Sequence, residues 1–225
     1  MQAGLPYSVI SAATAVDNGM GAKDMFSVLL LQGGGNFYTE DATKTTLDSE
    51  AAMNAFNQWC TFYDQYGFEL VYDFYTRFRN GEMPIAIAGF DQYNTLMAGA
   101  PEIRGQWGIA PVPGTEQADG SIDRSVGGAG TSIVMFDAAE DKDSCWEFIE
   151  WWTRAQTQET YDANVENVMG PAGRNATANL EAFSRLSWSD EELEALEEQR
   201  QYVQELREIP GSYFVSRCLD NAFRS

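Results

Sequence analysis

The sequence predicts an α/β fold, in which short buried strands alternate with amphipathic helices. Short β-prone runs end near Gly or Pro at residues 85–88 and 107–110, and apolar residues recur at helical spacing in 48–66 and 143–152. Alternation of this kind is typical of α/β domains. The 225 residues suffice for one large domain or two small ones, and no repeat or low-complexity tract divides them.

The first helices are predicted from apolar runs and end signals. Residues 1–23 carry no clear period, whereas residues 25–32 are dense in apolar side chains and stop at three glycines. Asp48 is the predicted N-cap of the next helix, which Gly67 ends. The predicted core face of this second helix carries Met53, Phe56, Cys60 and Tyr63.

The middle of the chain is predicted to hold three strands. Ile85 to Ala88 reads as a short buried strand, and Trp107 to Ala110 as another that prolines end. Residues 115–124 are polar and are expected to form a surface excursion. Residues 131–136 are β-prone again, and we expect a further strand there.

A broad apolar helix is predicted next. Asp143 or Ser144 is expected to begin it. An apolar stripe this broad requires two neighbours to cover it. The stripe consists of Cys145, Phe148, Ile149 and Trp152, broadened by Trp146 and Trp151.

The last part of the chain is predicted to hold two helices. Ser189 and Glu192 form a capping box that starts an acidic helix running through Arg207. Residues 209–211 break the chain, and residues 215–223 are again helical. No stop signal follows, so we expect the natural chain to continue.

Charge and composition exclude several functions. The chain has 14 basic and 34 acidic residues, a net charge of −20, which repels phosphate backbones and argues against nucleic acid. It has no histidine, so nucleophiles activated by histidine and imidazole metal ligands are excluded. The three cysteines are too few for a disulfide scaffold. Six Trp, ten Tyr and thirteen Phe suit both a core and a sugar-binding cleft.

Two stretches carry candidate site residues. Asp91 and Tyr93 follow the predicted strand 85–88, and α/β sheets bind ligands beyond the carboxyl ends of their strands. Helix capping and packing account for the same pair equally well. The glycines of residues 127–130 precede a strand and lack the Lys-Ser/Thr of a phosphate loop, which argues against a nucleotide.

Several stretches, in order and spacing, resemble the family 1 extracellular solute-binding proteins of carbohydrate ABC importers, to which maltose-binding protein belongs. The resemblance extends over nearly the whole chain and corresponds to the C-terminal part of such a protein. The stretches are residues 78–87, 101–103, 107–114, 127–128, 146–152, 210–217 and 221–224.

The resemblance implies a type II periplasmic-binding-protein-like lobe, with a mixed sheet flanked by helices in an αβα arrangement. It implies that residues 1–125 and 170–225 form the C-terminal lobe. Residues 126–169 would return toward a first lobe that this sequence lacks, and their helix would then lose part of its apolar cover in the chain alone.

The resemblance also implies the function. The protein would capture a mono- or oligosaccharide outside the membrane, as a cell-surface lipoprotein or a periplasmic protein, and deliver it to the membrane permease subunits of an ABC importer. It would act as a monomer, with no catalysis, cofactor or metal. The implied ligand contacts are Asp91, Tyr93, Gly127, Gly128, Tyr213 and Arg217.

Some of these residues would serve the fold equally well, and two other functions stay open. The glycines would also suit a hinge, and Arg217 could pair with one of many carboxylates. A hydrolase needs only two carboxylates, which would face each other across a cleft. A non-catalytic surface module would place all its aromatic residues in the core.

Overall fold

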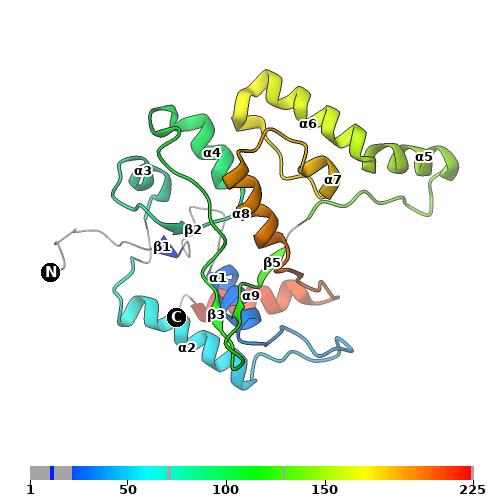
Figure 1. The fold of residues 1–225 in the computed structure, drawn as a ribbon. Helices are drawn as coiled ribbons and strands as arrows, with labels where there is room; N and C mark the ends of the chain where they lie inside the picture. The colour runs from blue at the N-terminus through cyan, green and yellow to red at the C-terminus, as the bar shows by residue number, and fades with distance from the viewer. Residues whose placement is uncertain (1–10, 13–21, 70–71, 129, 224–225) are drawn as a thin grey trace. The chain divides into compact units, whose positions relative to one another are not determined.

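The computed structural model describes residues 11–12, 22–69, 72–128 and 130–223, and the chain divides into two compact units. Unit 1 comprises Met1–Gln92, Pro111–Gly128 and Glu198–Ser225, and unit 2 comprises Tyr93–Ala110 and Ala129–Glu197. The sequence expectation for residues 1–21 lies outside the described residues, apart from Ser11 and Ala12. Figure 1 traces the elements along the chain.

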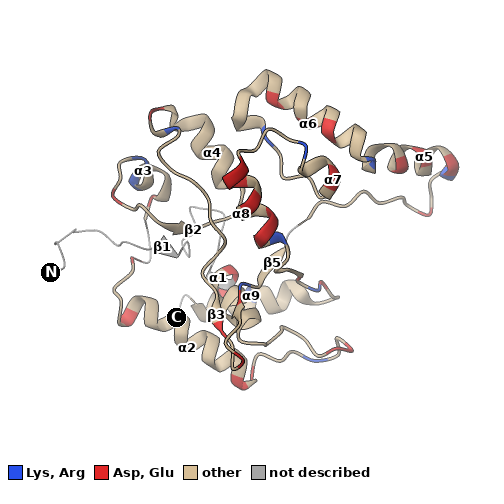
Figure 2. Cartoon of the chain, in the orientation of Figure 1, with Lys and Arg blue, Asp and Glu red and all other residues tan. Residues whose placement is uncertain are grey.

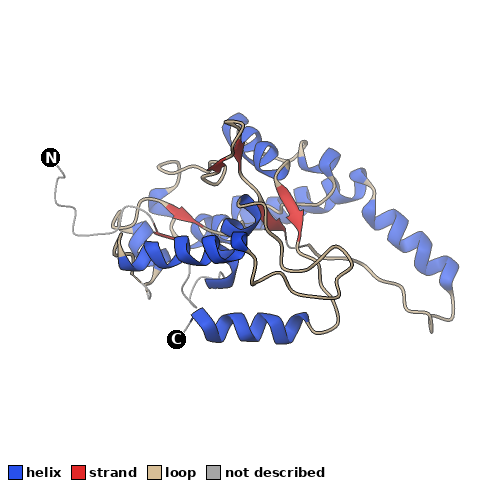
Figure 3. Ribbon diagram, turned by 90° about the horizontal axis from the view of Figure 1, so that it is seen from below, coloured by secondary structure: helices blue, strands red, loops and turns tan. Residues whose placement is uncertain are grey.

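Helices make up most of the regular structure (Figure 3). The α-helices are α1 (Ala22–Gln32), α2 (Glu50–Asp64), α3 (Phe74–Arg79), α4 (Asp91–Gly99), α5 (Lys142–Thr153), α6 (Ala155–Met169), α7 (Leu180–Phe183), α8 (Asp190–Arg200) and α9 (Ser212–Phe223). Short 3₁₀ turns are η2 (Pro101–Ile103) and η3 (Gly170–Gly173).

The described strands are short and pair two by two. They are β1 (Ser11–Ala12), β2 (Ala86–Ile87), β3 (Thr115–Glu116), β4 (Ile122–Asp123), β5 (Val126–Gly128) and β6 (Val203–Glu205). β1 with β2 and β5 with β6 are parallel, whereas β3 and β4 form an antiparallel hairpin in the predicted surface excursion. The α/β class is confirmed, and both strand directions occur, in three small sheets.

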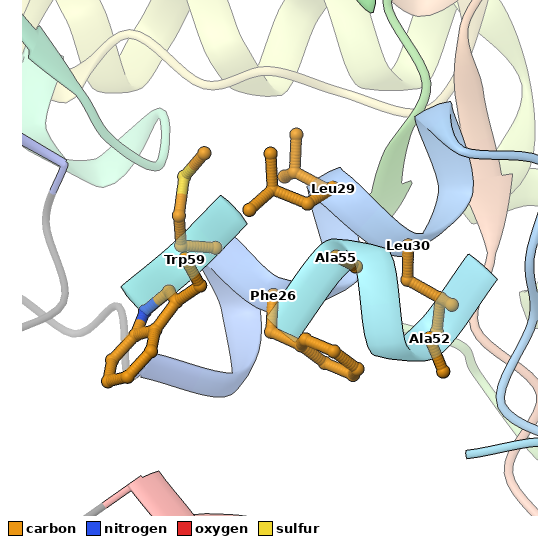
Figure 4. Packing of buried hydrophobic residues seen from close by; sticks show 8 residues of the cluster. Phe26, Leu29, Leu30, Ala52, Ala55 and Trp59 are labelled. Atoms are coloured by element: carbon orange, nitrogen blue, oxygen red, sulfur yellow. The ribbon is translucent and has the colours of Figure 1, made fainter. Parts of the chain in front are cut away.

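The core of unit 1 lies between α1 and α2 (Figure 4). The predicted apolar helix at residues 25–32 is confirmed as part of α1, and its Leu30 is fully buried. α2 begins one residue later than predicted, because the side chain of Ser49, not Asp48, accepts the hydrogen bond of the Ala52 N–H. The buried face of α2 is Ala52, Ala55 and Trp59. Of the predicted face, Phe56, Cys60 and Tyr63 pack at its margin, whereas Met53 is 51% exposed.

Glutamine side chains hold residues 112–125 in place within unit 1. The amide of buried Gln32 donates to the carbonyls of Pro113 (3.1 Å) and Ser125 (3.4 Å). Gln199 receives the Val112 N–H at 2.8 Å and donates to the Arg124 carbonyl at 3.1 Å. Two more contacts of this kind are Gln117 Nε2 to the Gln32 carbonyl and Gln204 Nε2 to Ser125 Oγ. Buried and partly buried backbone polar groups are thereby satisfied outside any sheet.

Two predicted strands are absent from the described residues. Residues 107–110 and 131–136 are irregular, because neither run has a ladder partner there. Trp107 packs edge-on against Tyr93 instead, with ring centroids 5.5 Å apart.

The predicted capping box is confirmed. The Ser189 N–H donates to Glu192 Oε2 at 3.0 Å, and the Glu192 N–H donates to Ser189 Oγ at 3.2 Å. The helix that follows, α8, ends at Arg200 and not at Arg207. Residues 203–205 instead form β6, which pairs in parallel with β5. The helical prediction for residues 215–223 is confirmed by α9.

α5 is an amphipathic helix with an open apolar face. Its N-cap is Asp141, whose carboxylate accepts the Ser144 N–H, and not the predicted Asp143 or Ser144. No side chain of this helix, which the structure describes throughout, is buried. Among the described helices none is both long enough and apolar enough to cross a bilayer.

Candidate ligand-binding site

Tyr93, a predicted ligand contact, lies inside unit 2 at the centre of an aromatic and ionic cluster. It sits on α4 and is 5% exposed. Arg174 donates from Nη1 to the Tyr93 hydroxyl at 2.8 Å, and its guanidinium carbon lies 4.9 Å from the centre of the Trp188 ring. Trp107 and Trp188 both meet the Tyr93 ring edge-on. The ring of Tyr93 is therefore covered by protein.

Carboxylates neutralise the buried guanidinium of this cluster. Glu166 accepts from Arg174 Nη2 at 2.6 Å and from Nε at 3.2 Å, and Glu192 Oε2 lies 3.5 Å from Nη1. Burial opposes the charge of Arg174, but the hydrogen bonds and charges of its partners prevail and raise its pKa. Burial raises the pKa of Tyr93 to about 12, against the opposing charge of Arg174. Tyr93 therefore stays protonated at ordinary pH.

Asp91, the other candidate after β2, begins α4 and is exposed. Its carboxylate accepts from Gln92 Nε2 at 2.9 Å. A Cβ on Gly89 would come within 2.5 Å of the Asp91 carboxylate, so the glycine leaves the space that this side chain uses. An exposed carboxylate can accept hydrogen bonds from sugar hydroxyls.

Gly127 and Gly128 lie in β5, where the space above each glycine is already filled. A Cβ on Gly127 would come within 2.5 Å of Leu206, and a Cβ on Gly128 within 2.5 Å of Val203. The missing side chains thus allow the β6 segment to pack closely on β5.

The first turn of α9 presents two aromatic rings to solvent. Tyr213 is 70% exposed and Phe214 is 67% exposed, with their centroids 5.7 Å apart. Ser212 anchors this turn, because its Oγ accepts the Tyr38 hydroxyl at 3.1 Å and the Ile209 N–H at 2.8 Å. Arg217 lies one turn further along the helix and is exposed.

The predicted residues therefore lie on three elements. In unit 1, Asp91 lies at the start of α4, the two glycines on β5, and Tyr213 and Arg217 on α9, whereas Tyr93 belongs to unit 2. Sequence reasoning missed Phe214, although it adjoins a predicted residue. It also missed Arg174 and Trp188, because no spacing rule brings residues so distant in sequence together.

A second surface feature is the apolar groove of unit 2. It is an open pocket of about 730 Å³ between residues 133–139 and the first half of α5. Ten of the eighteen large apolar side chains exposed among the described residues lie between Ile133 and Met169. Phe136 is 76% exposed and Trp146 is 59% exposed. The described residues contain no cluster of three or more Cys, Asp or Glu side chains suited to a metal ion.

Comparison with known protein families matches residues 6–159 to the bacterial extracellular solute-binding proteins. This match covers more than half of the chain. The chain belongs to this family. This assignment agrees with the resemblance found in the sequence motifs. The matched region contains both Asp91 and the residues of the apolar groove.

The fold of this solute-binding protein is also that of a solved sugar-binding protein. The structure of the sugar-binding protein MalE from the phytopathogen Xanthomonas citri matches with a TM-score of 0.70 at 18% sequence identity. The match covers 97% of this chain and 52% of MalE, so the chain spans about half the length of that protein. A search of curated proteins finds no match. The periplasmic-binding-protein-like α/β fold predicted from the sequence is thereby confirmed.

Proposed function

We propose that this chain is part of the sugar-binding component of an ABC importer. The fold that it shares with the sugar-binding protein MalE carries the proposal, together with its membership of the solute-binding family. The protein binds a mono- or oligosaccharide without turnover, as a monomer, and delivers it to the membrane permease subunits. It works outside the cytoplasm, as a cell-surface lipoprotein or a periplasmic protein.

The α9 aromatic pair, Tyr213 and Phe214, suits the apolar faces of a sugar. Pyranose rings present C–H groups on their faces and hydroxyls at their edges, so a site combines aromatic rings with polar groups. Asp91 supplies an exposed acceptor, and Arg217 supplies donors. Protein atoms cover the Tyr93 ring and occupy the space above Gly127 and Gly128. Ligand contacts at these three residues therefore stay predictions.

The apolar groove supports one part of the predicted lobe division, a contact of residues 126–169 with another lobe. We propose that residues 1–125 and 170–225 belong to the C-terminal lobe, and that residues 126–169 pack on the other lobe of a complete binding protein. An open apolar face of this extent is typical of an interaction surface. MalE is nearly twice as long as the matched region, which provides for such a second lobe.

Sugar binding is tested by NMR titration of the ¹⁵N-labelled chain with glucose, maltose, cellobiose and xylobiose, because NMR detects the weak binding expected of one lobe. We expect shifts at Tyr213, Phe214 and Asp91. The substitution Tyr213→Ala removes a stacking ring worth about 1.5 kcal/mol, which weakens binding about tenfold.

Tyr66→Ala is the matched control, since Tyr66 is also in unit 1 and is 64% exposed. It should leave binding unchanged. Spermidine and a neutral tripeptide are titrated in parallel at 150 mM salt, which suppresses non-specific attraction to a chain of net charge −20. Saturable binding of either one, with no shift from any sugar, would refute the carbohydrate assignment.

The apolar groove should bind the fluorescent probe ANS in the folded chain, because ANS reports exposed apolar surface. We expect the double substitution Val134→Asn, Phe136→Asn to reduce the bound fluorescence at least twofold. Val168→Asn, at a side chain of α6 that is 87% exposed, is the control and should change little. A folded chain without bound ANS would mean that this face is already covered, contrary to the proposal.

A further inference from the structure

Three turns of one helix hold a single loop within unit 2. Gln158, Asp162 and Glu166 are spaced four residues apart on α6 and so lie on one face. Gln158 Oε1 accepts from Thr177 Oγ1 at 3.0 Å, and Asp162 Oδ1 accepts from Asn175 Nδ2 at 3.3 Å. The third contact is the ion pair of Glu166 with Arg174, already described. Residues 174–177 are thus fastened to α6 by three successive side chains.

Of these three α6 side chains, Asp162 has the weakest hydrogen bonding. It is 1% exposed, and its Oδ2 is fully buried without a hydrogen-bond partner among the described residues. A buried carboxylate is costly unless several donors or a cation stabilise its charge. The amide of Asn175 is a single donor at a long distance, so the neutral carboxyl fits this site better than the charged one.

The charges that face Asp162 do not compensate it. One turn away on α6 lie Gln158, which is uncharged, and Glu166, which is anionic. The cation of Arg174 is already bound to Glu166 and Glu192. η3 brings no titratable side chain, and α7 brings Glu181, which pairs with Arg185. At the end of α5 Glu150 pairs with Arg154. On the described elements that pack most closely on α6, which are α5, η3 and α7, no cation is left to neutralise Asp162.

We propose that the Asp162 carboxyl is a pH-sensitive latch: when neutral it holds residues 174–179 on α6, and when it loses its proton to solvent it releases them. The released segment carries Arg174, so the Tyr93 cluster loosens with it. The same segment begins α7, because Asn179 accepts the Ala182 N–H with its side chain. Ionisation of Asp162 therefore changes the order of residues 174–179, of the start of α7 and of the Tyr93 cluster together.

The direction of the effect follows from burial. Desolvation raises the pKa of Asp162 above its ordinary value of 3.8, and the hydrogen bond from Asn175 only partly opposes it. The closed state thus holds a proton that the open state releases. Below pH 3.8 the latch contributes fully, and this contribution is lost as pH rises from there through the pKa of the closed state.

Hydrogen exchange at residues 174–179 tests the latch between pH 4 and pH 8. After correction for intrinsic exchange rates, protection should fall about tenfold per pH unit between the open-state and closed-state pKa values, because one proton is released on opening. Asp162→Asn keeps the acceptor for Asn175 and cannot ionise. We expect this variant to lose that pH dependence and to be protected as well at pH 8 as the wild type is at low pH.

Asp143→Asn, at an exposed position of α5, is the control and should leave the wild-type slope intact. The carboxyl carbon of Asp162, followed by ¹³C NMR in the wild type, reports its pKa even if the variant folds poorly. A wild-type slope that persists in Asp162→Asn, or an Asp162 pKa at or below 3.8, would overturn the proposal.

Discussion

The substitution Arg174→Ala should destabilise the protein by about 3 kcal/mol, since it removes a buried cation and leaves two partly buried carboxylates uncompensated. Arg174 is 7% exposed and is the cation that Glu166 and Glu192 share. Its loss also removes the hydrogen bond that Arg174 donates to the Tyr93 hydroxyl and the contact of its guanidinium with the Trp188 ring. Guanidinium unfolding, followed by tryptophan fluorescence, measures the change, because Trp107 and Trp188 both contact Tyr93.

Arg185→Ala is the matched control for this experiment. Arg185 also binds two carboxylates, Glu159 and Glu181, but its side chain is 45% exposed. Exposed ion pairs contribute at most about 1 kcal/mol, so the control should cost little. Equal losses of unfolding free energy in the two variants would show that burial does not determine how much Arg174 contributes to stability.

Leu30→Ala should cost about 2–5 kcal/mol, the usual range for truncation of a fully buried leucine. Leu30 belongs to α1, and its side chain lies in the core that α1 and α2 form in unit 1 (Figure 4). A Cβ built on Gly35 would come within 2.4 Å of its Cδ1, so Leu30 also fills the space above that glycine. The truncated side chain leaves a cavity that the helix backbone cannot close.

Hydrogen exchange of the α1 and α2 amides locates this loss in unit 1. Met53→Ala removes a side chain of similar size from α2, but Met53 is 51% exposed, and we expect a change within about 0.5 kcal/mol. A loss at Leu30 no larger than that at Met53 would mean that the core tolerates the cavity.

Local signals in the sequence predicted the helices well. The apolar run of α1 and the capping box at Ser189 depend on neighbours within one or two turns, and both are confirmed. Strands depend on distant partners. Residues 131–136 have the composition of a strand but no ladder partner in the described part of the chain, and the acidic helix gave way to β6 because residues 203–205 pair with β5.

The candidate site was predictable only in part. The position of Asp91 and Tyr93 after a strand was readable from the sequence, but their environments were not. One side chain is exposed and the other is buried under Arg174, because helix periodicity turns residues two apart to different faces. The glycines of β5 carried an ambiguous signal, since close packing of protein and close approach of a ligand both require a missing side chain.

Acidic residues are concentrated on α8, as Figure 2 shows. The contacts that hold segment 112–125 in unit 1, in contrast, include several uncharged glutamine amides. Glutamine neither titrates nor attracts counterions, so the medium has little hold on these contacts. In unit 2 the segment 174–179 hangs on carboxylates and a guanidinium. The glutamine contacts of segment 112–125 in unit 1 are thus insensitive to pH and ionic strength, whereas the contacts of segment 174–179 in unit 2 depend on both.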